Sequence, residues 1–175
     1  MMSIWKAAAA GMALAAMGAA PALAQQATAE LRNADGEIVG TATLSDVNGR
    51  LVVRVDATDL SPGFHGFHIH GVGSCEPPDF ASAQGHFNPD GADHADHAGD
   101  LPNLLVMADG TASMRVVTDR ASVADLLDGD GTAIIIHADP DNHAHIPERY
   151  ADEPDEDTLA TGDAGARIAC GVVTE

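Results

Sequence analysis

Residues 63–71 constrain the fold of this chain more than any other part of the sequence, because an alternating pattern there coincides with closely spaced histidines. His68 and His70 are separated by a single residue, and Phe67 and Ile69 alternate with them. In an extended strand, side chains at positions i and i+2 lie on the same face, about 7 Å apart. The pattern predicts a strand with two apolar side chains in a core and two imidazoles on the opposite face, where one metal ion could lie between them. Histidines in strands are more often surface residues or hydrogen-bonded core residues, so a metal site needs support from the rest of the chain.

Short runs of β-branched and other apolar residues recur along the chain, with turn signals between many of them. The expected strands, besides the one with the paired histidines, are residues 28–33, 37–44, 51–57, 103–107, 111–117, 133–137 and 166–173. Asn48 and Gly49, between two of these runs, are the strongest short-range signal for a hairpin. About eight short strands predict an all-β fold, which closes most readily as an antiparallel barrel or sandwich. Ser122 is expected to cap one helical turn.

Two long polar stretches, residues 71–100 and 138–165, interrupt the succession of strands. Loops of this length in a small domain are usually functional or disordered. Candidate metal-binding side chains are concentrated in and beside them: His86, His94, His97, Asp100 and His137. This concentration favours a functional role for both loops. The Asp-Gly-Asp-Gly sequence at 128–131 lacks the remaining ligands of a calcium loop, so a turn is expected there.

Residues 1–24 have the pattern of a secretory signal peptide, with Lys6 before an alanine-rich apolar run and small residues at the cleavage positions. An uncleaved membrane anchor fits less well, because the run is short for a bilayer span of about 20 apolar residues. Residues 25–175 are then expected to form one domain, periplasmic or secreted, with no membrane attachment after cleavage. The sequence leaves the oligomeric state open, a homodimer included.

The charge of the chain is strongly negative, with a formal net charge of −19 that becomes about −20 once Lys6 is removed. Nucleic acid and anionic membrane surfaces are poor partners for such a protein. Cys75 and Cys170 are the only cysteines. Export would place them in an oxidising compartment, where one disulfide closing a long loop is expected; two buried free thiols are the alternative.

Five motifs, taken in order, resemble those of the bacterial copper/zinc superoxide dismutases. They are GFHGFHIHG at 63–71, GHFNP at 85–89, HADHAGDLP at 94–102, AIIIH at 133–137 and GARIACG at 165–171. The resemblance extends over residues 31–173 and implies an eight-stranded Greek-key barrel with two long functional loops. It also implies dismutation of superoxide to dioxygen and hydrogen peroxide, by copper that cycles between Cu(II) and Cu(I) beside a structural zinc. A non-catalytic copper- or zinc-binding protein on the same barrel is the alternative.

The resemblance implies a role for each candidate side chain. The copper ligands would be His68, His70, His86 and His137, and the zinc ligands His86, His94, His97 and Asp100. Imidazole nitrogen suits copper, and three nitrogens with one carboxylate suit tetrahedral zinc. His86 would bridge the metals as imidazolate and supply a proton during turnover. Asp141 would link a copper histidine with a zinc histidine, Arg167 would guide the anion, and His65 would bond to backbone.

The chain departs from the family pattern in two places. Only two residues separate His94 from His97, which is tight for zinc ligands, so Asp93 or Asp96 could replace one of them. The second long loop contains no lysine, and Arg149 is its only cation. Attraction of superoxide would then come mainly from the metals and the guiding arginine. Two further histidines, His143 and His145, have no ligand counterpart and are expected at the surface.

Overall fold

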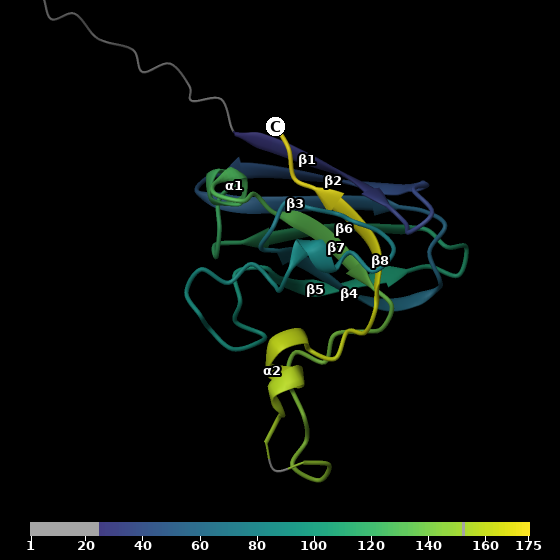
Figure 1. Cartoon of the computed structure of the whole chain (residues 1–175), viewed down its shortest axis with the longest axis vertical. Helices are drawn as coiled ribbons and strands as arrows, with labels where there is room; N and C mark the ends of the chain where they lie inside the picture. Colours follow the sequence, from purple (N-terminus) through teal and green to yellow (C-terminus); the bar gives the residue numbers. More distant parts are fainter. Residues whose placement is uncertain (1–24, 152) are drawn as a thin grey trace, which may run out of the picture.

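Eight strands form one antiparallel sheet in the computed structural model of the chain, which describes residues 25–151 and 153–175 (Figure 1). The strands are β1 (Gln26–Arg32), β2 (Ile38–Val47), β3 (Arg50–Ala57), β4 (Gly63–His70), β5 (Asp100–Val106), β6 (Ala112–Thr118), β7 (Ala133–His137) and β8 (Arg167–Val172). Their order in the sheet is β5-β4-β7-β8-β1-β2-β3-β6. The two end strands, β5 and β6, are consecutive in the chain and lie beside each other, so the sheet nearly closes into a barrel. The predicted fold class is confirmed, and the expected signal peptide at 1–24 lies outside the described residues.

The core of the barrel follows from the period-2 pattern of the strands. Buried and exposed side chains alternate along all of β1, and Leu31 of that strand is fully buried. Phe67 and Ile69 of β4 are fully buried in the same core, as the alternation predicts. Burying an apolar side chain of this size contributes about 1.5–3 kcal/mol to folding, so the core fixes the register of β4. The opposite face of β4 therefore carries His68 and His70.

The turn and cap signals act as expected. Asn48 and Gly49 both have positive φ and connect β2 to β3 as a two-residue hairpin, and Val47 pairs with Arg50 across it. Ser122 caps the short helix α1 (Val123–Leu127) through a capping box, and residues 128–131 form a turn. The bounds of the strands differ from the expected ones by a few residues at most.

One helix is missing from the sequence-based prediction, which treated residues 138–165 as loop throughout. Helix α2 (Glu156–Thr161) lies in this stretch and projects from the barrel on the side of β4 and β5 (Figure 1). Asp155 caps its first turn, and Gly162 ends it in the left-handed conformation that glycine adopts most readily. In the described part of the chain, no helix has the length and apolar character needed to span a membrane.

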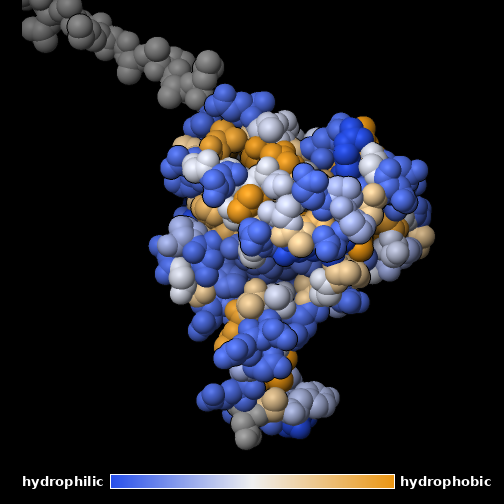
Figure 2. All heavy atoms as spheres, in the orientation of Figure 1, coloured by the Kyte–Doolittle hydropathy of each residue, from blue (hydrophilic) through white to orange (hydrophobic). Residues whose placement is uncertain are grey.

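The two long connections cover the histidine-bearing face of β4. The first joins β4 to β5 and includes the 3-10 turn η1 (Ala81–Ala83), and the second joins β7 to β8. Because β4 lies between β5 and β7 in the sheet, both connections start from neighbouring strands. They bury His68 and His70 almost completely, to 0% and 1% exposure. Hydrophilic side chains cover much of the face of the molecule that Figure 2 shows.

Candidate metal centre

Four imidazoles meet at the face of β4 that the long connections cover. His68 and His70 come from β4, and His137 ends the neighbouring strand β7. His86 comes from the first connection, which forms a bridge with β4 at His70. One ring nitrogen from each of the four lies within 4.8 Å of the others. The structure thus brings together the copper group expected from the sequence.

Hydrogen bonds on the outer side of these rings decide which nitrogen faces the centre. Nε2 of His68 lies 2.7 Å from a carboxylate oxygen of Asp141, and Nδ1 of His70 donates to the carbonyl oxygen of Gln84 at 2.7 Å. Nδ1 of His137 donates to the carbonyl oxygen of Gly165 at 3.1 Å. The inward atoms are therefore Nδ1 of His68 and Nε2 of the other two rings, and these two Nε2 atoms are 3.4 Å apart.

A second group, sharing His86, occupies the first connection. Nδ1 of His86 and Nδ1 of His97 lie 2.8 and 3.3 Å from Oδ1 of Asp100, and Nδ1 of His94 lies 3.0 Å from Oδ2. The short spacing of His94 and His97 does not keep either ring out of the group. The two alternatives considered above, Asp93 and Asp96, are exposed and are not members of it.

Two buried nitrogens test whether metals fit these groups. Among the described residues, Nδ1 of His68 is a buried side-chain atom without a hydrogen-bond partner, and the buried Nδ1 of His94 faces Oδ2 of Asp100, itself a candidate ligand, at 3.0 Å. Leaving such an atom unpaired costs about 1–3 kcal/mol. One of these atoms points into each group, beside further imidazole nitrogens and, in the second group, a carboxylate. The donor sets fit copper in the first group and zinc in the second.

Asp141 connects the two groups from outside. Its fully buried carboxylate lies 2.7 Å from Nε2 of His68 and 2.8 Å from Nε2 of His94. Burial alone would raise the pKa of Asp141, but the hydrogen bonds with the two imidazoles hold it far below its usual value. The side-chain amide of Asn103 on β5 fixes the Asp141 backbone by two hydrogen bonds of 2.8 Å. No local pattern in the sequence marks Asn103 for this role.

Burial and hydrogen bonding set different protonation states in the two groups. Burial lowers the pKa of His68 to about 4 and that of His137 to about 3, and it holds the pKa of His70 well below the usual value. Burial acts in the same direction on His94, but hydrogen bonds to two carboxylates overcome it and raise the pKa to about 9. At neutral pH the metal-free protein thus presents the first three as neutral ligands, whereas His94 must lose a proton to bind a metal.

The remaining histidines have structural or peripheral positions. The ring nitrogens of His65 lie 2.7 Å from the carbonyl oxygen of His137 and 2.8 Å from that of Ser61, so the predicted bonding to backbone is confirmed. His143 and His145 are exposed, as expected. His143 also stacks on His94, with ring planes 6° apart, a contact that the sequence did not indicate.

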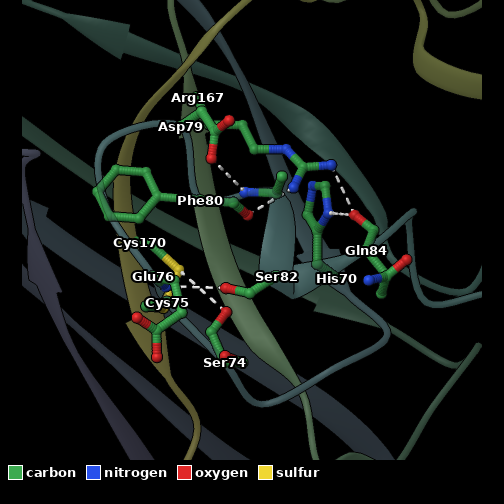
Figure 3. Close-up of a disulfide and its surroundings, with 11 residues drawn as sticks. His70, Ser74, Cys75, Glu76, Asp79, Phe80, Ser82, Gln84, Arg167 and Cys170 are labelled. Carbon is green, nitrogen blue, oxygen red and sulfur yellow. Dashed lines mark hydrogen bonds between the residues drawn. A yellow bond between two sulfur atoms is a disulfide. The ribbon is translucent and has the colours of Figure 1, made fainter.

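The disulfide lies beside Arg167 (Figure 3). Cys75 and Cys170 are bonded, with Cα atoms 5.7 Å apart, so the predicted pairing is confirmed. Arg167 donates from Nη1 to the carbonyl oxygen of Phe80 and from Nη2 to that of Gln84, both at 2.6 Å. The Gln84 carbonyl oxygen also accepts from His70, so one backbone atom holds both the arginine and a ring of the first group.

A cavity of about 420 Å³ opens onto the first group. His70, His86 and His137 line it together with Arg167, and the exposed residues Asp157 and Asp163 line it as well. Its other lining residues are Gly85, Ala160, Thr161 and Gly165. Arg149, the cation of the second long loop, is not among them and lies over the ring of Tyr150. Arg167 is thus the sole cationic side chain that lines this cavity in the described part of the chain.

A Greek-key barrel with two adjoining histidine groups that share one ring defines a class of proteins with a dinuclear metal centre. The family model "Copper/zinc superoxide dismutase" matches residues 38–173. The chain therefore belongs to the copper/zinc superoxide dismutase family. The predicted enzyme activity, dismutation of superoxide, and the two predicted cofactors, copper and zinc, are confirmed.

Relatives from bacteria support this membership. The Cu-Zn superoxide dismutase of Mycolicibacterium paratuberculosis is 43% identical over 98% of this chain and 84% of its own length. That of Mycobacterium tuberculosis is 46% identical over 86% of this chain and 70% of its own length. The solved Cu/Zn superoxide dismutase from Brucella abortus has a TM-score of 0.68 and 32% identity, and covers 86% of this chain and 100% of its own. A mutant of a SOD-like protein from Bacillus subtilis has a TM-score of 0.71 and 38% identity, over 85% of this chain and 97% of its own.

Proposed function

We propose that the two histidine groups divide the metals as the sequence suggests. His68, His70, His86 and His137 hold copper, and His86, His94, His97 and Asp100 hold zinc. The buried, unpaired Nδ1 of His68 carries this proposal, because that atom would otherwise be a cost to the fold, and the approach of Nδ1 of His94 to the Asp100 carboxylate supports the second group. The shared ring uses Nδ1 on the side of Asp100 and has Nε2 left for the copper group. A ring bound through both nitrogens has no N–H and is an imidazolate, a form that two cations favour.

Bound copper would supply one-electron redox chemistry, and bound zinc would supply charge and rigidity. The residues of the chain manage protons and orientation. When Nε2 of His86 is not bound to copper, it could take a proton from water and give it to the departing peroxide, while Nδ1 would stay beside Asp100. Asp141 keeps His68 and His94 in fixed tautomers, because its carboxylate accepts from Nε2 of each.

Arg167 is proposed to bind the superoxide anion at the copper side of the cavity. Two of its N–H groups are used by backbone carbonyls, so the guanidinium is held in place while further N–H groups stay available. A planar cation fixed in this way can orient a small anion through hydrogen bonds. Asp157 and Asp163 line the same cavity, so the attraction of this arginine acts at short range against a negative surface.

Metal analysis of single variants tests the ligand assignment. We expect His137→Ala to lose copper and most of the superoxide-decay activity while zinc stays bound. We expect His97→Ala to lose zinc affinity more than copper affinity. His145→Ala is the matched control, since this histidine is exposed and belongs to neither group. Equal loss of both metals in both ligand variants would refute the division proposed here.

We further propose that residues 1–24 are removed on export and that residues 25–175 act in the periplasm or outside the cell. The Cys75–Cys170 disulfide supports this, because such bonds persist in oxidising compartments. The mature chain is expected to begin at Gln25, which N-terminal sequencing or intact mass measurement of the fractionated protein would detect. Full-length chain in the cytosolic fraction alone would refute export.

A further inference from the structure

Arg120, in the connection between β6 and α1, reaches the backbone between His94 and His97. Its Nη1 donates to the carbonyl oxygen of Ala95 at 2.8 Å and to that of His97 at 3.1 Å. Its Nη2 donates to the carboxylate of Asp96 at 3.0 Å. One guanidinium therefore contacts three consecutive residues of the segment that carries two candidate zinc ligands.

Other hydrogen bonds hold the two ends of this segment: the amide of His97 donates to Oδ2 of Asp100 at 3.0 Å, and the amide of Asp100 donates to the carbonyl oxygen of His97 at 3.2 Å. Both histidine rings must turn inward although only two residues separate them, and Asp96 stays exposed. The amide of His94 donates to the carbonyl oxygen of Leu159 at 3.0 Å, which fixes the start of the segment to α2. Among the described residues, Arg120 is the sole hydrogen-bond donor to the Ala95 carbonyl oxygen. The carbonyl group of Ala95, between the two histidines, is thus held by this arginine.

The two kinds of contact that Arg120 makes, with carbonyl oxygens and with a carboxylate, differ in what they contribute. The ion pair with Asp96 is exposed, with side-chain exposures of 39% and 82%, and exposed pairs contribute little. Hydrogen bonds from a charged guanidinium to carbonyl oxygens are stronger than neutral ones and have fixed directions. The anchoring effect is therefore expected from the carbonyl contacts, and a lysine, with a single ammonium group, reproduces them poorly.

We propose that Arg120 is a positioning residue for zinc, which holds the Ala95–His97 backbone so that the imidazoles of His94 and His97 face Asp100. This proposal rests on the zinc assignment made above. It implies that Arg120 slows the release of zinc without touching the metal. Residues that orient metal ligands typically change metal affinity by about 10- to 100-fold when they are removed.

Chelator challenge of the fully metallated protein tests this role. We expect Arg120→Ala to release zinc at least about 10-fold faster than the unchanged protein, with copper retained. Arg120→Lys should keep most of this defect, and Asp96→Asn should stay within about twofold of the unchanged protein, because the exposed pair contributes little. Arg115→Ala is the matched control, since Arg115 is an exposed arginine on β6 that pairs with β3 away from the zinc group.

A spectroscopic measurement separates positioning from general destabilisation. Co²⁺ in place of zinc reports its ligand geometry through visible absorption, and Arg120→Ala should alter that spectrum while Arg115→Ala leaves it unchanged. Asp100→Ala tests the underlying site: if it releases zinc no faster than the unchanged protein, the zinc assignment itself is wrong. If Asp100→Ala releases zinc quickly but Arg120→Ala behaves like Arg115→Ala, or if Arg120→Lys restores full retention, the positioning role is refuted.

Discussion

Removal of the Cys75–Cys170 disulfide is expected to reduce stability by an amount that the structure sets. The bond joins residues 95 positions apart in the sequence. The loop-closure entropy that such a bond removes from the unfolded chain corresponds to about 4–5 kcal/mol at 25 °C. For a domain of this size, each kcal/mol shifts the melting temperature by about 2–4 °C, so Cys75→Ala with Cys170→Ala should lower it by about 8–20 °C. Alanine suits Cys170, which is buried and packs against apolar neighbours.

The same substitution should affect catalysis through Arg167. The disulfide ties the first connection to β8, and that connection supplies the Phe80 and Gln84 carbonyl oxygens that hold the guanidinium (Figure 3). Without the bond, these acceptors are held less firmly relative to the strand that carries the arginine, because contacts such as that of Gln84 with His70 remain. We expect a slower reaction with superoxide at unchanged copper content.

The assay combines urea unfolding with superoxide decay. Unfolding is measured on the metal-free protein, because a bound metal would add its own stabilisation of the folded state. A double-mutant cycle with Arg167→Ala tests the functional link: the arginine substitution should cost less activity when the disulfide is already absent. A stability loss below about 1 kcal/mol would refute the loop-closure argument. Fully additive losses of activity would refute the link to the arginine.

Three further results are expected. Gly162→Ala should weaken zinc binding and folding, because a Cβ on this positive-φ residue would collide with the Asp141 carboxylate and the His94 ring. Thermal melts and zinc titration measure both effects, and unchanged stability and zinc affinity would contradict the prediction. The stability of the metal-free protein should fall as pH rises from about 6.5 through 9, because the raised pKa of His94 stabilises the fold only while the ring stays protonated. Urea unfolding at several pH values measures this fall, and a constant free energy of unfolding would contradict the prediction. The dismutation rate should change little or rise with added salt, because salt screens the negative surface over about 10 Å at 0.1 M. The rate should fall in Arg167→Ala, because this substitution removes the cationic side chain that lines the cavity. Stopped-flow measurements test both predictions, and a steep fall of the rate with salt, or an unchanged rate in Arg167→Ala, would contradict them.

Local patterns in the sequence predict most of the fold and the grouping of the site residues. The alternation of Phe67 and Ile69 with two histidines determines the faces of β4, and the Asn48-Gly49 pair determines a hairpin, because both signals act over neighbouring residues. The predicted start of β5, at residue 103, is too late, because the strand begins at Asp100. This start depends on the pairing of Asp100 with His68 of β4. Such pairing between distant segments leaves no local pattern.

The supports of the site were harder to predict than the candidate ligands. Imidazoles and carboxylates that bind metals are chemically distinctive, whereas a backbone carbonyl such as that of Gln84 has no signature in the sequence. Asn103 and Arg120 have no distinctive pattern in the sequence. Only the fold brings Asn103 to Asp141 in the second long connection, and Arg120 to Ala95 in the first. Helix α2 was missed because only its Asp155 cap and final Gly162 mark a single short turn.

The two histidine groups are joined twice, and under the ligand assignment proposed above this double connection makes their metal affinities interdependent. His86 belongs to both groups, and Asp141 bonds His68 of one and His94 of the other. A proton on His94 is stabilised by the same carboxylate that orients His68, so displacement of that proton by zinc changes the electrostatic surroundings of the copper group. Coupling between binding sites is reciprocal in free energy, so copper must alter zinc affinity by the same factor as zinc alters copper affinity. A carboxylate buried between two imidazoles therefore acts as a connection between the redox site and the structural site, in addition to orienting their rings.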